Sequence, residues 1–308
     1  MKRALLIVII TICATITYAQ KEHYLFANIG GGLHNIDYVL RDVSKYDKEC
    51  GYDWSGRIGF MGEIGWQWFF TKHFGVGLGA GFSNLGAKTE LNFTQTNANL
   101  TDNENGMQYN ELISYNNFQE RQRQTVMNLP LTLYYRTSFT DRMHLIVGVS
   151  ALYTSVLSQK YKTIGGNIST GKYCPDLELN YSGLDDKEHG VYTVSDFSGD
   201  TKLQKTLYGV RLHPQFCYDL NNDHRISLLF GMYFANNFGD QRECYNGDLY
   251  YVATNDYKGI TQCTIGDRVN SIYLGLSAGI RIRVGGKEKP KKEEEEPLEE
   301  DLLNMPKL

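Results

Sequence analysis

The sequence predicts an all-β protein: an eight-stranded antiparallel transmembrane β-barrel with four long extracellular loops and short periplasmic turns. Three observations support this prediction. The 308 residues include 31 glycines and 22 tyrosines but only 6 prolines, and a polar chain rich in glycine and aromatic residues is typical of barrels with aromatic girdles. Apolar residues recur at every second position in eight segments, which is the period of a strand. The connections between these segments alternate between short and long.

Residues 1–19 have the pattern of a secretory signal peptide. Two cations precede the apolar run 4–16, and the small residue Ala19 follows soon after it. A signal peptide has this order of regions, and the run is shorter than the roughly 20 residues of a membrane-spanning helix. We therefore expect export from the cytoplasm, with residues 20–284 forming the barrel.

The strand segments follow from the alternation of apolar residues. In the last segment every second residue from Ile272 to Val284 is apolar, and small or polar residues stand between them. Successive side chains of a strand point to opposite faces, so one face is wholly apolar. The eight expected strands are 24–33, 57–70, 74–82, 125–136, 144–157, 207–218, 226–235 and 271–284. Each has about the length that a tilted strand needs to cross a bilayer.

The connections assign the two ends of the barrel. The expected tight turns are 70–74, 137–143 and 219–225, and the expected long polar loops are 34–56, 84–124, 158–206 and 237–270. Short turns at one end and long loops at the other describe an outer-membrane barrel with both termini in the periplasm. An even number of strands closes the sheet, so no strand edge faces lipid.

A soluble barrel or sandwich would show the same alternation with the apolar face turned inward. The membrane alternative is favoured by the signal peptide and by the 74–82 segment, whose second face consists of four glycines. It is also favoured by Trp66, Trp68, Phe70 and Phe74, which gather near a short turn, where an interfacial girdle belongs. The surrounding outer-membrane lipid is thus an expected partner.

The expected lumen face carries one clear carboxylate, Glu63, among several arginines. We predict a lumen charge network of Glu63, Arg57, Arg211, Arg281 and Arg283, because charges in so dry a space must be paired. Glu63 is expected to form a bidentate bridge with Arg211 or Arg281 that closes the lumen. The network either fills space and fixes the strand register or, alternatively, gates a narrow pore.

The cysteine pattern permits disulfides, because an exported chain meets an oxidising environment. Cys50, Cys174, Cys244 and Cys263 all fall in the expected long loops. Pairing Cys244 with Cys263 would staple the fourth loop, and pairing Cys50 with Cys174 would tie the first loop to the third. Other pairings and free thiols remain open.

No motif of catalysis or of ligand binding stands out. The chain lacks the HExxH, CxxC and glycine-rich phosphate-loop patterns, and no Ser, His and Asp are spaced in a way that identifies a triad. We expect no enzyme, no cofactor and no metal site. The net charge of −4 is also too near zero for a nucleic-acid-binding stripe, so no nucleic-acid partner is expected.

The tail 285–308 contains eight acidic residues, five lysines and two charge blocks, which predicts a disordered periplasmic segment. Leu298, Leu302, Leu303 and Met305 follow the acidic run, so residues 287–308 are also a candidate docking peptide for a periplasmic partner. The four long loops, rich in Tyr and Asn, are the candidate surface for an external ligand or protein.

Taken together, the strands up to Val284 resemble the small outer-membrane barrels typified by the OmpA transmembrane domain. Their glycine-rich, tyrosine-rich texture and the Ala-Gln after the signal are similar to the outer-membrane β-barrel family common in Bacteroidetes, which includes PorT-like proteins. The resemblance implies a non-enzymatic surface protein whose loops serve binding, adhesion or envelope integrity. The alternatives are a PorT-like accessory component of a secretion or assembly machine and a lipid-modifying barrel enzyme.

Overall fold

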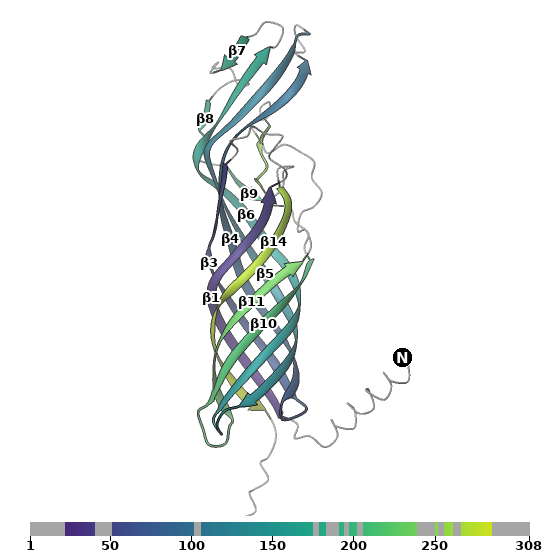
Figure 1. The fold of residues 1–308 in the computed structure, drawn as a ribbon, viewed down its shortest axis with the longest axis vertical. Helices are drawn as coiled ribbons and strands as arrows, with labels where there is room; N and C mark the ends of the chain where they lie inside the picture. Colours follow the sequence, from purple (N-terminus) through teal and green to yellow (C-terminus); the bar gives the residue numbers. More distant parts are fainter. Residues whose placement is uncertain are drawn as a thin grey trace, which may run out of the picture.

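The computed structural model describes residues 22–40, 51–101, 106–174, 179–182, 191–193, 197–201, 206–238, 250–251, 256–260 and 266–284, and they form a β-barrel (Figure 1). Its strands, in order around the barrel, are β1 (Glu22–Leu40), β3 (Ile58–Phe69), β4 (Phe74–Thr101), β5 (Gln108–Ser138), β6 (Met143–Cys174), β10 (Thr206–Asp219), β11 (Ile226–Phe238) and β14 (Gly266–Val284). Neighbouring strands are antiparallel, and the pairing of β10 with β6 closes the ring. Among the described residues, no helix is long and apolar enough to cross a membrane. The predicted eight-stranded barrel is confirmed.

The barrel is apolar outside and polar inside. Ile58, Leu78 and Leu276 point outward and are 87%, 58% and 66% exposed, whereas Gln67 and Arg281 point inward and are each 1% exposed. A soluble barrel has the reverse arrangement, because water would contact its polar face. Lipid is therefore the environment that suits this outer surface.

Glycines leave room for large side chains in the lumen. A Cβ at Gly77 would lie 2.7 Å from the ring of Tyr134, and one at Gly79 would lie 3.0 Å from Oε1 of Glu63. Both glycines belong to the all-glycine face of β4 that the sequence shows at 74–82. The missing side chains of this face leave space, and inward-pointing side chains of neighbouring strands extend into it.

The tight turns close one end of the barrel as expected. The amide of Phe139 donates to the carbonyl of Met143 at 2.9 Å, and the amide of Leu220 donates to the carbonyl of Ile226 at 2.9 Å. At the same end Trp66 and Trp68 stack with ring centroids 6.4 Å apart, and the His23 ring stacks on both. This row of rings is the expected interfacial aromatic cluster.

At the other end the strands are longer than predicted, so all four expected loops need correction. β14 begins at Gly266, inside the expected fourth loop 237–270. β4 and β5 stay paired from Phe74 and Tyr135 up to Thr101 and Gln108, so 84–124 is a long hairpin rather than a loop. The first part of 158–206 continues β6, which stays paired with β5 up to Tyr173. β1 likewise runs to Leu40, inside the expected first loop. We call residues 86–101, 108–124 and 159–174 of β4, β5 and β6 the projection (Figure 1).

Short strands extend the sheet of the projection. β2 (Gly51–Gly56) pairs with β4, and β7 (Leu179–Ser182), β8 (Val191–Thr193) and β9 (Ser198–Asp200) pair with β6. A separate hairpin is formed by β12 (Tyr250–Tyr251) and β13 (Asp256–Tyr257). The alternation of Thr89, Leu91 and Phe93 within 88–94 predicts strands that project above the membrane, and β4 confirms this. The full extent of the sheet was not predicted, because polar residues outnumber apolar ones in the projection.

Candidate functional site

The middle of the lumen is crossed by an ion pair between Glu63 of β3 and Arg211 of β10. Arg211 donates through Nη2 to Oε1 of Glu63 at 3.1 Å and through Nη1 to Oε2. Each residue is only 5% exposed. β3 and β10 are not neighbours in the barrel, so this bidentate contact bridges the lumen. The structure thus has Arg211 rather than Arg281 as the partner of Glu63.

Neutral polar contacts fill the lumen on either side of this pair. His213 lies 2.9 Å from the hydroxyl of Ser277, and His34 lies 2.6 Å from the hydroxyl of Tyr233. His34 also lies 3.0 Å from the carbonyl oxygen of Asn84. These side chains connect strands across or along the wall, and their buried polar groups find partners within the lumen.

A second charged group lies near the turn end of the barrel. Glu22 forms ion pairs with Arg136 at 2.7 Å and with Arg283 at 3.6 Å. The hydroxyl of Tyr24 donates to Glu22 at 3.1 Å. Arg283 thus lies in a charge group separate from Glu63, and the carboxylate that organises this group is one that the sequence interpretation missed.

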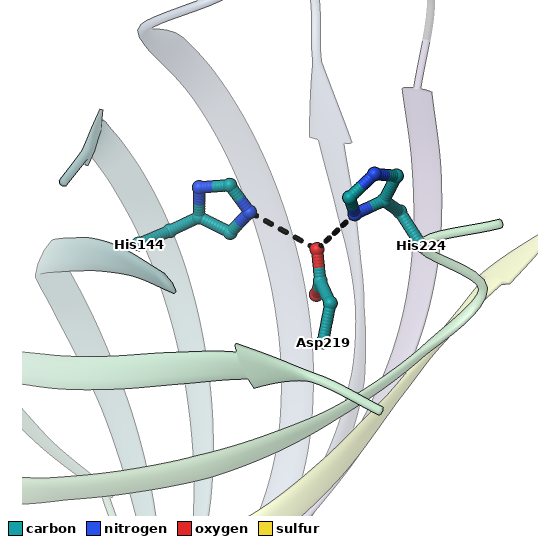
Figure 2. A group of neighbouring side chains, drawn as sticks. All are labelled: His144, Asp219 and His224. Atoms are coloured by element: carbon teal, nitrogen blue, oxygen red, sulfur yellow. Dashed lines mark hydrogen bonds and ion pairs between the residues drawn. The ribbon is translucent and has the colours of Figure 1, made fainter. Parts of the chain in front are cut away.

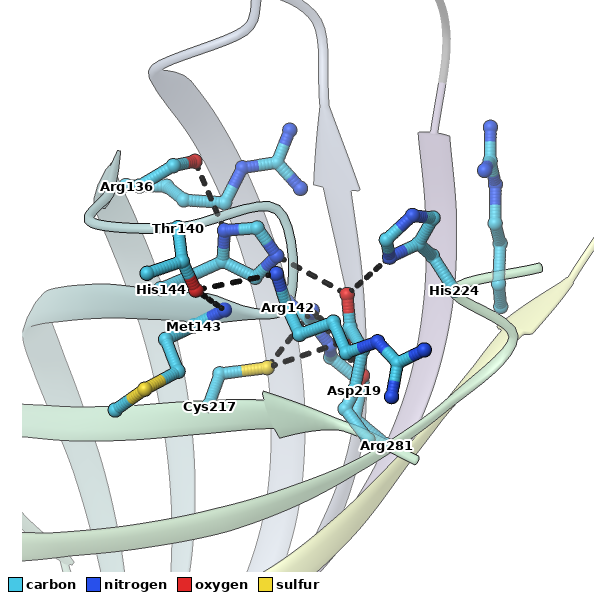
Figure 3. Close-up of polar contacts among 12 residues, drawn as sticks. Arg136, Thr140, Arg142, Met143, His144, Cys217, Asp219, His224 and Arg281 are labelled. Atoms are coloured by element: carbon cyan, nitrogen blue, oxygen red, sulfur yellow. Dashed lines mark hydrogen bonds and ion pairs between the residues drawn. The ribbon is translucent and has the colours of Figure 1, made fainter. Parts of the chain in front are cut away.

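Arg281 is buried between the two charge groups and Asp219. Its guanidinium lies 4.0 Å from the centroid of the Tyr24 ring, and Nη2 is 3.0 Å from Sγ of Cys217 and 3.9 Å from Oδ1 of Asp219. Ser227 donates to Oδ1 of Asp219 at 2.6 Å. The end of β10 is therefore held by a compact polar cluster (Figure 3).

Asp219 also joins two histidines (Figure 2). Its Oδ2 atom lies 3.0 Å from Nε2 of His144 and 2.7 Å from Nδ1 of His224. The second nitrogen of His144 lies 2.8 Å from the hydroxyl of Ser138, with which His144 is directly paired across β5 and β6. The three residues come from the start of β6 and from the turn after β10, so the cluster connects two neighbouring turns.

The groups of this cluster are those of a metal site, of a hydrogen-bonded link between turns or of a catalytic relay. The ligand atoms of His144, Asp219 and His224 lie within 4.8 Å of one another, and two imidazoles with one carboxylate are a ligand set that zinc accepts. The separations from Asp219 are hydrogen-bond distances, and both imidazoles can donate to one carboxylate oxygen. The chain Ser138–His144–Asp219 has the order of a catalytic relay, but its serine and histidine are ordinary cross-strand neighbours. We interpret the cluster as a lock between turns.

The projection has a buried carboxylate of its own, Glu120 of β5. It accepts hydrogen bonds from the hydroxyl of Tyr257, from Nε2 of Gln122 at 2.6 Å and from the amide of Ile260 at 3.1 Å. Burial raises the pKa of Glu120, and these donors lower it by less. The contacts attach segment 256–260 to the sheet, outside the lipid-facing part of the barrel.

Around Glu120 the projection has an apolar core. Phe118 and Tyr257 pack edge to face with ring centroids 5.2 Å apart, and Phe93 packs on Tyr115 at 4.7 Å. Further buried members are Leu91, Ile113, Ile168 and Ile260. The same buried cluster continues into the barrel through Met61, Leu152 and Tyr233, so the projection and the barrel share one core and are joined by three continuous strands.

Arg57 lies outside the predicted lumen network. It stands at the break between β2 and β3, which interrupts the alternation that placed it on the lumen face. The pKa of Arg57 is lowered mainly by burial, and the positive charges of Arg121 and Arg123 lower it further. Arg57 is therefore part of a basic group at the base of the projection.

The predicted disulfides are not described by the structure. Cys50, Cys244 and Cys263 lie outside the described residues, and the side chain of Cys174 does too. The predicted signal peptide 1–19 and tail 285–308 also lie outside them. Cys217 is a buried free thiol.

A family model described as the outer membrane protein beta-barrel domain matches residues 18–213, more than half of the chain. The chain belongs to this family. The outer membrane is accordingly the location of the barrel, and the resemblance to small outer-membrane barrels seen in the sequence is confirmed.

Several solved structures are similar to this chain at low sequence identity. Neisserial surface protein A is 10% identical, with 85% of this chain and 97% of that chain covered and a TM-score of 0.31. The attachment invasion locus protein Ail of Yersinia pestis is 8% identical, with 86% and 99% covered and a TM-score of 0.30. OprG of Pseudomonas aeruginosa is 11% identical, with 87% and 97% covered and a TM-score of 0.35. No curated protein matches the chain.

Proposed function

We propose that this chain is a non-enzymatic, non-conducting outer-membrane protein that presents the projection as a binding surface for an extracellular partner. One observation carries the proposal: β4, β5 and β6 continue far beyond the lipid-facing wall as a sheet that buries apolar side chains on one face. A barrel needs only short connections to close, so this folded extension calls for a role outside the membrane.

The lumen supports the non-conducting part of the proposal. An eight-stranded barrel has an interior just wide enough for its own side chains. Here Glu63 and Arg211 bridge it, and both are buried from solvent. A buried bidentate pair is costly to separate, because each charge would be left uncompensated. The pair therefore suits a permanent closure better than a gate.

The shape of the projection supports the binding part. Its residues Thr96 and Asn116 are exposed near the far end of β4 and β5, while Glu120 fixes segment 256–260 against the inner side. Preordered strands lose little conformational entropy when a partner binds. A rigid sheet of this kind suits recognition of a protein or glycan surface.

The proposal is tested by photocrosslinking on intact cells that express the protein. A benzophenone amino acid is placed at Thr96 or Asn116 on the projection, and at the lipid-facing Leu131 as the matched control. We expect discrete macromolecular adducts from the two projection sites and only lipid adducts from Leu131. Projection sites that give no adduct distinct from the control would contradict the proposal.

A chain truncated after Gly286 separates this function from that of an accessory component engaged through the tail. The truncated chain should give the same adducts as the full chain if the projection binds the partner. Loss of the adducts on truncation would favour the accessory role. Planar-bilayer recordings of the full chain should show no discrete channel openings; well-defined steps would contradict a closed lumen.

A further inference from the structure

Six cationic side chains gather at the base of the projection, and we call them the cationic face: Arg57, Lys88, Arg121, Arg123, Lys160 and Lys162. Their positions follow from the strand register. Lys88 is paired with Arg121, and Arg121 with Lys162. In the row nearer the membrane, Arg123 is paired with Lys160. Residues directly opposite on antiparallel strands share one side of the sheet, so both rows point the same way.

The cationic face continues the lipid-facing surface of the same strands. Below it on β4, β5 and β6 come the small polar outward residues Asn84, Thr125 and Ser158. Apolar outward residues follow them: Phe82, Leu129 and Leu157 are 57%, 39% and 52% exposed. Lys160 follows Leu157 by roughly 10 Å of strand. The headgroup layer of a bilayer is on the order of 5–8 Å thick on each side, and a tilted strand crosses it within about three residues. The cationic face therefore lies at the level of lipid headgroups.

The positive charges of the cationic face outnumber the acidic side chains that the structure describes beside it. Within the described part of the chain, none of the six side chains forms an ion pair, and Nε of Arg121 is buried without a hydrogen-bond partner. Two acidic residues lie beside the cationic face: Glu90 accepts from Gln119 at 2.8 Å, and Asp200 is paired with Lys160 on β9. Like charges this close repel, so a bound anion would stabilise the arrangement.

A cleft of about 370 Å³ connects the cationic face to the lipid-facing wall. Arg57 and Arg123 line one part of it, and Ile58 and Phe60 line another. Ile58 and Phe60 are 87% and 65% exposed on the outer surface. Gly86 lies between the two arginines, and a Cβ there would lie 3.0 Å from Cδ of Arg57. The cleft is thus cationic toward the projection and apolar toward the membrane.

We propose that the cationic face binds the phosphate of an anionic phosphorylated lipid, in the leaflet from which the projection emerges, with an acyl chain against Ile58 and Phe60. Guanidinium groups bind phosphate oxygens in pairs of parallel hydrogen bonds, and clusters of basic residues at a membrane surface bind anionic headgroups. A lipid fits better than a soluble polyanion because the cleft opens onto the surface that lipid tails cover.

The test measures lipid retained by the full chain in detergent, using native mass spectrometry. The probes are dioleoyl phosphatidic acid, dioleoyl phosphatidylcholine and inorganic phosphate. The variant Arg57→Gln/Arg121→Gln/Arg123→Gln removes three charges from the cationic face. The matched control Lys72→Gln/Arg142→Gln/Arg225→Gln removes three exposed charges from the turn end. Heat-modifiable gel mobility reports whether each barrel is folded.

We expect the wild-type chain to retain phosphatidic acid over phosphatidylcholine, the first variant to retain at least about ten-fold less, and the control to match the wild type. Equal retention by the first variant, or equal loss in the control, would overturn the proposal. Displacement of the lipid by equimolar inorganic phosphate would overturn it as well. If the triple variant does not fold, the single change at an exposed position, Arg123→Glu, should still lower retention.

Discussion

Glu63 and Arg211 contact each other across the lumen although 148 residues separate them in the chain. Their two parallel hydrogen bonds join β3 to β10, which lie on different sides of the ring. The contact ties together parts of the wall that share no backbone hydrogen bonds. It therefore helps to maintain the cross-section of the barrel and also fills the lumen.

Removing one member of this pair should be more harmful than removing both. We expect Glu63→Ala to lower the free energy of unfolding by about 3–5 kcal/mol, because Arg211 is left buried without its counter-charge. A double variant, Glu63→Leu/Arg211→Met, should lose less than the single one. Urea unfolding of the barrel refolded in lipid vesicles measures both. A single variant as stable as the wild type would rule out a stabilising bridge.

The glycine face of β4 should not accept side chains. We expect Gly77→Ala to destabilise the barrel by roughly 1–3 kcal/mol, the usual range for overpacking, because its Cβ would lie 2.5 Å from the carbonyl oxygen of Trp66 and 2.7 Å from the Tyr134 ring. Gly62 is the matched control, since a Cβ there meets nothing within 4 Å. Gly62→Ala should be neutral or slightly stabilising. Similar losses for the two variants would contradict this packing.

Asp219 should contribute more to the free energy of unfolding than either histidine that it contacts. Asp219→Ala removes an acceptor shared by His144, His224 and Ser227 and leaves buried donors unpaired, so a loss of about 1–3 kcal/mol is expected. His224→Ala removes one contact from a half-exposed ring and should cost less. The same vesicle-based urea titration gives both values. A larger loss for His224→Ala than for Asp219→Ala would show that Asp219 is not the residue that holds this cluster together.

The attachment of segment 256–260 should weaken as the pH rises. Burial raises the pKa of Glu120 above its ordinary value of 4.5. A group whose pKa is higher in the folded state stabilises that state fully below the unfolded pKa and loses its contribution as the pH rises through the folded pKa. Protection of the Ile260 amide from hydrogen exchange, corrected for intrinsic rates, should therefore decrease with increasing pH above 4.5.

The variant Glu120→Gln is the control for that experiment, because it cannot ionise and has nearly the same shape. Its Ile260 protection should be close to that of the wild type at acidic pH, where the protonated carboxyl also has one donor and one accepting oxygen, and it should not vary with pH. A wild-type profile as flat as that of the variant would show that Glu120 does not titrate in the tested range.

Strand periodicity was sufficient to predict the barrel, because lipid and lumen impose opposite demands on alternate residues. It also singled out Glu63, a lone carboxylate on a lumen face. It failed at Arg57, which stands at a break between two strands, and it predicted projecting strands only at 88–94, because polar residues obscure the alternation in the rest of the projection. Contacts such as those of Asp219 with His144 and His224 join separate turns, and local spacing carries no signal for them.

The uninterrupted strands of the projection have a mechanical consequence. A partner that pulls on the far end would load β4, β5 and β6 along their length, so neighbouring strands would have to slide past each other rather than peel apart. Many hydrogen bonds would then have to break together. The barrel wall would take up the force directly, and the protein would act as a stiff tether fixed in the membrane.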